Sequence, residues 1–442
     1  MISLYNRAIL CLLAVLVGLV LSYNFYIGYQ SFTVTPFVLS GDGPDYIQIA
    51  ACFAKTTRFG HLTTDYLTII KELNQGVFLL TDHEFSAYHT WRPPIWPLLL
   101  ALIFGFFKFG LLAAHVIKFL FILIGGFLFF KVLKTLEVSY PLILLGTVLY
   151  LIHPALQIYS RTFLSEPLTY FMMTFLLYSI VLYDKRKKIM HLILMGVFSG
   201  LLVLTHPYYI FLPPLLIAAQ GWWMKVSLKR LVVLVFCFFV VVSPWLYRNY
   251  ALYDGAGLFL TTSTGAVLAK GWNNEVLSTH NNVDGDLADE SLVLSPEDDK
   301  VFWSSNELGR SQLYAKRTLE FIWSNQGIII PIAVKKLKSA FNPLRERSKP
   351  GILQSLNELH RIASLVCLLF LLCARNKTIR SLVWALLLAT IMITLLMYSG
   401  LRFRTGQVPI EILLIIWSLN LGFKKLRPSI QNALSLGQGE KR

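Results

Sequence analysis

The chain has 442 residues, of which 55% are hydrophobic and only 14% are charged. A soluble domain averages about 25% charged residues, so the composition excludes an ordinary soluble protein. The net charge of +16 is typical of basic cytoplasmic loops that face anionic lipid. No nucleic-acid-binding motif accompanies it, so no nucleic-acid partner is expected.

Continuous apolar runs of roughly 17 to 22 residues recur along the chain, and each is long enough to cross a bilayer core of about 30 Å. Such runs favour helices over the alternating pattern of a membrane barrel. We therefore expect an all-α polytopic membrane protein with about ten or eleven transmembrane helices. The runs lie at 7–27, 94–110, 111–130, 140–158, 163–183, 189–205, 208–224, 231–247, 352–373, 381–398 and 407–423.

Three regions follow from these runs. Residues 1–247 form a membrane module whose first loop, 28–93, is polar, residues 248–350 form a second polar region, and residues 351–442 add the last helices and a short tail. The basic run "DKRKK" at 184–188 predicts a cytoplasmic loop, which places both polar regions at the outer face. The alternation then closes if the proline-rich run 94–110 does not cross the membrane as a simple helix. The alternative places Lys131 and Lys134 outside, but the basic run at 184–188 would then lie outside as well.

Charged and polar side chains gather at the predicted outer ends of the spans. Each of them alone also fits an interfacial anchor. Together, arginines can hold a lipid phosphate, and a carboxylate can accept a proton from a hydroxyl group. If the phosphate leaves a sugar carbon, the reaction is glycosyl transfer, and it needs no glycine-rich nucleotide loop. The residues are Asp42, Asp45, Arg92, Arg161, Glu166, His206, Arg248, Arg402 and Arg404.

The motifs around these residues resemble the GT-C membrane glycosyltransferases, in the bacterial branch related to protein O-mannosyltransferases and to the lipid A aminoarabinose transferase. The similarity covers most of the chain and depends on the order and spacing of the motifs. The matching segments are "GDGPDYIQIA", "WRPPIWPLLLAL", "YSRTFLSEPLTYF", "LTHPYYIFLPPLL", "SPWLYRNY" with "LTTSTGAVLAKGWNN", and "LRFRTGQVPIEILL".

The resemblance implies a GT-C fold with juxtamembrane helices in the first external loop. It also implies inverting transfer of a sugar from a polyprenyl-phosphate donor to a glycan, lipid or protein of the cell envelope, such as lipopolysaccharide. The enzyme would lie in the bacterial inner membrane with its site on the periplasmic side. No cofactor and no metal-binding residue is expected, and the sequence leaves the need for a divalent metal open.

The resemblance assigns roles to the residues by position. Asp42 is the expected catalytic base, and Glu166 orients the acceptor or the sugar. The expected donor-phosphate ligands are Arg92, His206, Arg402 and Arg404. The further site residues are Tyr46, Arg161 and Arg248.

The chain departs from the family pattern at two places. Gly43 stands where the family has a glutamate. Asp45, one helical turn from Asp42, either supplies the missing carboxylate or caps a helix over 46–56. His206 replaces a permanent cation, and because an ordinary histidine titrates near pH 6.5, phosphate binding is expected to weaken at high pH.

The second polar region shows no catalytic signature of its own. The acidic stretch "DGDLADE" at 284–290 is a solvated loop or a metal ligand set. Residues 300–323 have helical periodicity and either lie on the membrane or cover an acceptor site.

Three other classes remain as alternatives. An O-antigen ligase or polymerase would use a pyrophosphate-linked donor, but it would carry its key residues in a late loop. A transporter would place acids near the bilayer midplane, which these spans avoid. A GT-C protein that has lost its activity is the third, with Gly43 as the main indication.

Overall fold

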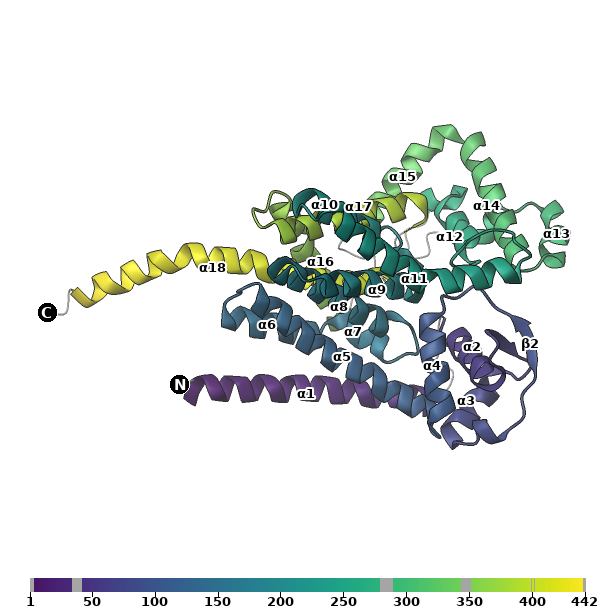
Figure 1. Cartoon of the computed structure of the whole chain (residues 1–442), viewed down its shortest axis with the longest axis horizontal. Helices are drawn as coiled ribbons and strands as arrows, with labels where there is room; N and C mark the ends of the chain where they lie inside the picture. The colour runs from purple at the N-terminus through teal and green to yellow at the C-terminus, as the bar shows by residue number, and fades with distance from the viewer. Residues whose placement is uncertain are drawn as a thin grey trace.

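The protein is described by a computed structural model that covers residues 4–33, 42–278, 289–342, 351–398, 400 and 402–439. Long helices run along one axis of the molecule, and the start of α1 and the end of α18 lie at the same end of it (Figure 1). The bundle consists of α1 (Leu4–Thr33), α5 (Gly110–Thr135), α6 (Tyr140–Leu151), α8 (Glu166–Arg186), α9 (Ile189–Thr205), α10 (Leu212–Trp223), α11 (Leu228–Leu252), α16 (Ile352–Leu371), α17 (Lys377–Leu396) and α18 (Val408–Gly439).

Among the described residues, seven helical segments are long and apolar enough to cross a membrane. They confirm the prediction of an all-α polytopic membrane protein. The predicted spans 94–110, 189–205, 208–224 and 352–373 are also helical, but they fall short of those seven in length or apolar character. The seven are Cys11–Thr33, Gly110–Thr135, Tyr140–Ser160, Glu166–Arg186, Leu228–Leu252, Lys377–Leu396 and Phe403–Lys424.

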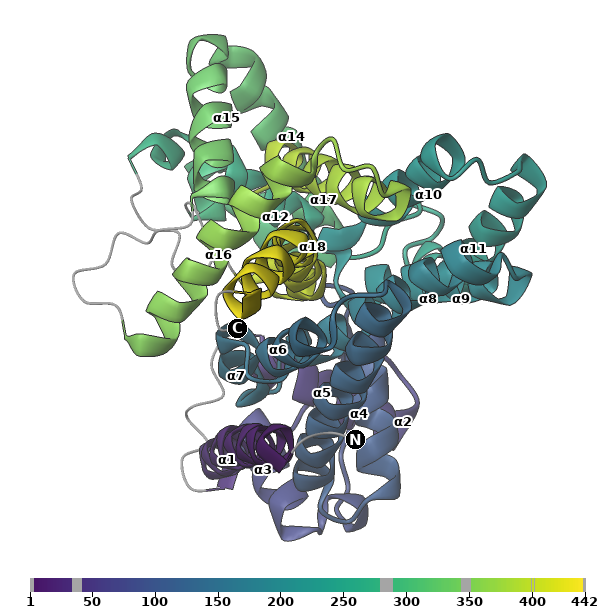
Figure 2. The same cartoon turned by 90° about the vertical axis from the view of Figure 1, so that its left-hand side faces the viewer.

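The α8 helix lies at the centre of the bundle, and 83% of its most apolar window is buried. It packs against α5 on one side and α9 on the other (Figure 2). Leu177, Leu382 and Leu413 from three different helices share one core with almost no exposed surface. The core therefore fixes the position of Glu166, the first residue of α8.

The first polar region folds against the end of the bundle that lies opposite the start of α1, which we call the distal end (Figure 1). Ile47, Ile69, Trp96 and Phe104 form its apolar core. Its two strands pair antiparallel, with Gly60 opposite Tyr88. The region consists of α2 (Gly43–Thr56), β1 (Gly60–Leu62), α3 (Tyr66–Gln75), η2 (Phe78–Leu80), β2 (Phe85–Tyr88) and α4 (Ile95–Phe106).

Local sequence signals explain where these elements begin and end. The Asp65 carboxylate accepts hydrogen bonds from the Leu67 and Thr68 amides and caps α3, and Gly76 ends this helix with φ +72°. The α2 helix begins at Gly43, and Asp42 occupies its cap position without a side-chain cap. Asp45 lies in the first turn, so the alternative that Asp45 caps this helix is wrong.

The α4 helix is 12 residues long. At 1.5 Å per residue it extends about 18 Å, which is less than a bilayer core. This length agrees with the prediction that 94–110 does not cross the membrane as a simple helix.

The second polar region also packs at the distal end, beside the first (Figure 1). Its elements are α12 (Thr264–Gly271), η4 (Asn274–Leu277), η5 (Glu290–Val293), η6 (Pro296–Asp298), α13 (Asp299–Ser304), α14 (Glu307–Ser324) and α15 (Gln326–Phe341). Most of the predicted acidic stretch 284–290 lies outside the described residues. The predicted helix over 300–323 is present as α13 and α14.

Candidate active site

Four of the predicted site residues converge at the distal end from four different segments. Asp42 precedes α2, and Arg92 lies between β2 and α4, directly before Pro93. Glu166 begins α8, and Arg402 precedes the short helix η7 (Phe403–Gln407). The folding of the first polar region against the bundle is therefore required to assemble the cluster.

The two arginines bridge the carboxylates. Arg92 Nη2 lies 2.9 Å from Asp42 Oδ1 and 2.6 Å from Asp45 Oδ2. Arg402 Nη2 pairs with the other Asp42 oxygen, and Arg402 Nε lies 2.8 Å from Glu166 Oε1. Asp42 thus lies between two guanidinium groups. Arg92 also pairs with Asp45, and Arg402 also pairs with Glu166.

The two arginines keep Asp42 ionised. Burial alone would raise the pKa of this carboxyl group, but the Arg402 and Arg92 guanidiniums hold its pKa below the ordinary value. Asp42 is therefore in the form that accepts a proton, and it is a weak base for as long as both cations remain bound to it. A ligand that draws the arginines away would strengthen the base.

Glu166 is the most buried acid of the cluster, with 2% of its surface exposed. Its distance to Arg402 is that of an ion pair, but the angle is not that of a hydrogen bond, and neither carboxylate oxygen has a hydrogen-bond partner among the described groups. Attraction between opposite charges depends only weakly on angle, so at 2.8 Å the two groups form an ion pair. Glu166 therefore depends on Arg402 as its cation.

Tyr46 and His206 complete the wall around the cluster. Tyr46 is buried, and the Arg92 guanidinium lies 5.9 Å from the centre of its ring. His206 follows α9, and its ring packs edge-on against Phe403 at 5.2 Å. Burial and then Arg402 lower the pKa of His206 to about 3. The expectation that His206 titrates near pH 6.5 is therefore wrong, and its role in phosphate binding stays a prediction.

Two predicted site residues lie elsewhere. Arg404 Nη2 donates to Glu411 Oε1 at 2.9 Å, and Arg404 Nη1 donates to the Ala340 carbonyl. Arg161 Nε donates to Asn24 Oδ1 of α1 at 2.8 Å. Neither side chain lines the cavity described below. Arg404 therefore lies apart from the other predicted phosphate ligands, and Arg161 lies apart from the cluster.

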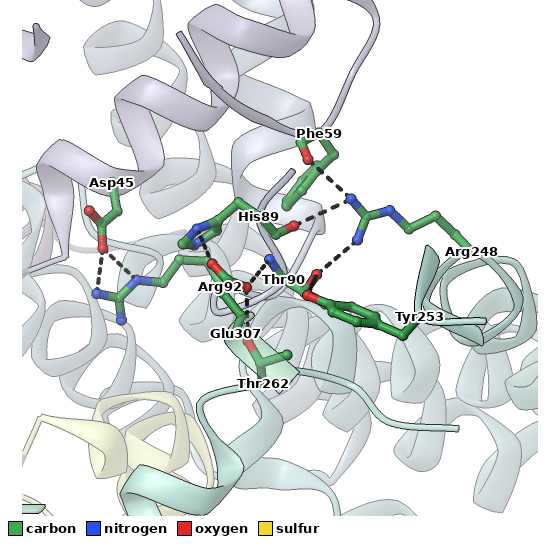
Figure 3. A network of polar contacts seen from close by, with 9 residues as sticks. All are labelled: Asp45, Phe59, His89, Thr90, Arg92, Arg248, Tyr253, Thr262 and Glu307. Carbon is green, nitrogen blue, oxygen red and sulfur yellow. Dashed lines mark hydrogen bonds and ion pairs between the residues drawn. The ribbon is translucent and has the colours of Figure 1, made fainter. Parts of the chain in front are cut away.

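Arg248 joins α11 to the first polar region (Figure 3). Its Nη2 donates to the carbonyls of Phe59 at 3.0 Å and His89 at 3.3 Å, and its Nη1 donates to Thr90 Oγ1 at 3.2 Å. The guanidinium also lies 4.8 Å from the Trp245 ring. This predicted site residue therefore holds the site's scaffold and does not face the cavity.

A cavity of about 1320 Å³ opens beside the charged cluster. One wall is apolar and comes from the α9 to α11 segment, and another carries hydroxyl groups and an ion pair between Lys270 and Glu290 at 3.3 Å. The charged end is formed by Asp42, Arg92 and Arg402, with Tyr46 and His206. The apolar wall includes Val203, Phe211, Pro214, Ile217, Phe238 and Leu246.

Sequence reasoning missed three charged residues at this end of the molecule. Lys270 and Glu290 line the cavity, and Glu307 binds the segment that carries Arg92. Lys270 lies within a matched motif, so its position in "AVLAKGWNN" was an available signal. Glu307 is 217 positions from its partner Thr90, and nothing in the local sequence marks it. Among the described residues, no three His, Cys, Asp or Glu side chains are arranged to hold a metal ion.

The fold and the site define a polytopic helical membrane protein with a charged cluster at the end of a partly apolar cavity. No protein-family model and no curated protein matches the chain. Two solved structures are similar to it: ArnT from Cupriavidus metallidurans in the apo state, at 12% identity, and the same protein bound to undecaprenyl phosphate, at 13% identity. Both similarities cover 89% of this chain and 77% of the ArnT chain, with a TM-score of 0.43.

At this identity and TM-score, no site residue and no substrate is transferred from ArnT to this chain.

Proposed function

We propose that the chain is a glycosyltransferase that moves a hexose or pentose from a polyprenyl-phosphate donor to a hydroxyl group of an acceptor. The observation that carries the proposal is the cavity, in which Asp42 lies between Arg92 and Arg402 next to a long apolar wall. An amphiphile with one anionic group fits such a surface, because its chain can lie on the wall while its phosphate meets the arginines.

In the proposed reaction, the donor phosphate takes over the guanidinium contacts of Arg92 and Arg402. Asp42 then loses the cations that depress its pKa and becomes a stronger base. It accepts the proton of the acceptor hydroxyl while that oxygen forms a bond to the anomeric carbon of the sugar. The bond between that carbon and the phosphate oxygen breaks, and the arginines stabilise the polyprenyl phosphate that leaves.

A direct displacement of this kind inverts the anomeric centre, because the acceptor oxygen attacks opposite the phosphate. The Lys270–Glu290 pair and the hydroxyl groups of Thr261, Ser263 and Thr264 line the remaining wall. This wall is the proposed place for the acceptor, which is a glycan, a lipid or a protein of the cell envelope.

The charge distribution supports a site at the outer face of a bacterial inner membrane. The basic residues Lys131 and Lys134 end α5, and Lys185 and Arg186 end α8, whereas the candidate site lies at the start of α8. Because cytoplasmic loops carry the excess of lysine and arginine, the distal end is assigned to the periplasmic side.

The purified protein in detergent can be tested by native mass spectrometry with equimolar undecaprenyl phosphate and undecaprenyl pyrophosphate. The proposal expects selective retention of the monophosphate and its loss in Arg92→Gln. Selective retention of the pyrophosphate would favour the ligase or polymerase alternative. Retention of neither lipid, in a protein that remains folded, would contradict the proposed donor class.

A further inference from the structure

The short segment 89–92 has partners on both sides: His89 and Arg92 also contact earlier residues of the first polar region, whereas Thr90 contacts residues from much later in the chain (Figure 3). Thr90, at its centre, is fully buried. Its amide donates to Glu307 Oε2 at 2.8 Å, and its carbonyl accepts from the Thr262 amide at 3.1 Å. Its hydroxyl lies 3.1 Å from Tyr253 Oη and accepts from Arg248. Every polar group of Thr90 is therefore used by the second half of the chain.

Glu307 joins three segments through one carboxylate. Oε2 accepts from both the Thr90 amide and the Thr262 hydroxyl, the latter at 3.1 Å, and Oε1 pairs with His89 Nδ1 at 3.0 Å. Asn306 caps α14 by accepting from the Gly309 amide, so the Glu307 side chain is left to reach the first polar region. Its negative charge at the start of an 18-residue helix is also favoured by the helix dipole.

Arg92 follows Thr90 by two residues and precedes two prolines, which restrict the backbone on its other side. The position of its backbone therefore depends on how firmly 89–91 is held, while its guanidinium contacts Asp42 and Asp45. We propose that Glu307 is a positioning residue that fixes Arg92 for phosphate binding, an assignment that rests on the proposed function for the role of Arg92.

Glu307 has a second possible effect, because a contact between the two polar regions can stabilise the fold without affecting Arg92. The two roles differ in what they change. Positioning affects phosphate affinity beyond any loss of stability, whereas a purely structural contact lowers the unfolding temperature alone.

The experiment uses three variants of the full-length protein in detergent. Glu307→Ala removes all three contacts. Glu307→Gln keeps an amide oxygen for the Thr90 amide and an NH₂ group that can donate to His89 Nδ1. Asp298→Asn is the matched control, because Asp298 is a buried carboxylate of the same polar region that pairs with Arg317 at 2.6 Å and does not touch 89–92.

Two readouts are measured for each variant: hydrogen exchange of a peptide covering 88–92, and the dissociation constant for undecaprenyl phosphate. We expect Glu307→Ala to speed exchange at 88–92 and to weaken phosphate-lipid binding about tenfold, the effect of losing one hydrogen bond to a charged group. Glu307→Gln should recover most of the affinity. Asp298→Asn should match the unmodified protein in both readouts, even if its unfolding temperature falls.

Unchanged exchange in Glu307→Ala would overturn the assignment, and so would an affinity equal to that of Asp298→Asn. Equal losses in Glu307→Gln and Glu307→Ala would also overturn it, because they would show that only the charge matters. If the unmodified protein binds no undecaprenyl phosphate, the proposed function fails, and the exchange measurement still decides whether Glu307 holds 89–92.

Discussion

Replacing Arg402 by glutamine tests two effects of the charged cluster, its contribution to the stability of the fold and its contribution to phosphate binding. Arg402 is the cation nearest Glu166, which is almost fully buried, and one of two cations on Asp42. Removing one partner of a buried ion pair typically costs about 3 to 5 kcal/mol, because the other charge is left uncompensated. We expect a loss on the order of 3 kcal/mol, at the lower end, since Asp42 keeps Arg92.

The loss is measured as the change in unfolding free energy in detergent, together with the affinity for undecaprenyl phosphate. Arg404→Gln is the matched control: Arg404 pairs with the buried Glu411 at 2.9 Å, and Glu411 keeps His360 at 3.0 Å. Both variants should lose similar stability, and only Arg402→Gln should lose phosphate-lipid affinity, by at least about tenfold.

The double variant Arg402→Gln/Glu166→Gln tests the physical cause. Without the Glu166 charge, no fully buried carboxylate remains uncompensated, so most of the lost stability should return while the phosphate affinity stays low. A double variant that is no more stable than Arg402→Gln would refute the reasoning, and so would normal affinity in Arg402→Gln.

Three further predictions follow from single side chains. Folding lowers the pKa of His206 from 6.5 to about 3. Above about pH 6.5 the histidine is neutral in both the folded and the unfolded protein and does not affect stability. As the pH falls from 6.5 towards 3, the unfolded protein binds a proton that the folded protein does not, so the free energy of unfolding decreases. Unfolding midpoints at pH 5 and 7.5 should therefore differ less in His206→Gln than in the unmodified protein, and equal differences would contradict the burial. A Cβ at Gly43 would meet nothing within 4 Å, so Gly43→Glu should have the same unfolding temperature as the unmodified protein. If Asp45 supplies the missing acid, Gly43→Glu/Asp45→Asn should transfer sugar faster than Asp45→Asn. Arg248→Lys should cost on the order of 2 kcal/mol in chemical unfolding, since an ammonium group cannot reproduce the fork that binds Phe59, His89 and Thr90, and a change below about 0.5 kcal/mol would contradict this role.

The helical bundle could be predicted from the sequence because a membrane requires long apolar runs, and every predicted run contains a helix in the structure. Helix lengths were harder to predict. A proline divides the run 140–158, because Pro154 begins α7 (Pro154–Ser160) directly after α6. The run 208–224 is divided between the short helix η3 (Pro207–Tyr209) and α10, which begins at Leu212. The apolar pattern continues across both breaks, so composition alone does not reveal them.

The convergence of Asp42, Arg92, Glu166 and Arg402 could be inferred because each lies beside a helix end, and alternating spans bring those ends to one side. The direction in which a side chain points within a turn could not be inferred from the sequence. Arg402 and Arg404 are two residues apart around a short 3-10 helix, and they pair with different acids, Glu166 and Glu411.

The Glu307 contact could not be predicted for another reason. It joins segments 217 positions apart, and neither segment has a periodic pattern that indicates its partner. Contacts of this kind depend on how the two polar regions pack, which no local propensity specifies.

The central claim, that Asp42 is the base of a sugar transfer, is tested most directly in a strain that lacks the gene. Mass spectrometry of its envelope glycolipids is compared after complementation with the unmodified protein or with Asp42→Asn at equal membrane levels. We expect the unmodified protein to restore a sugar-bearing product that the deletion lacks, and Asp42→Asn to remain folded while leaving the product absent and its polyprenyl-phosphate sugar accumulated. Restoration of the product by Asp42→Asn at the normal rate would contradict this role for Asp42.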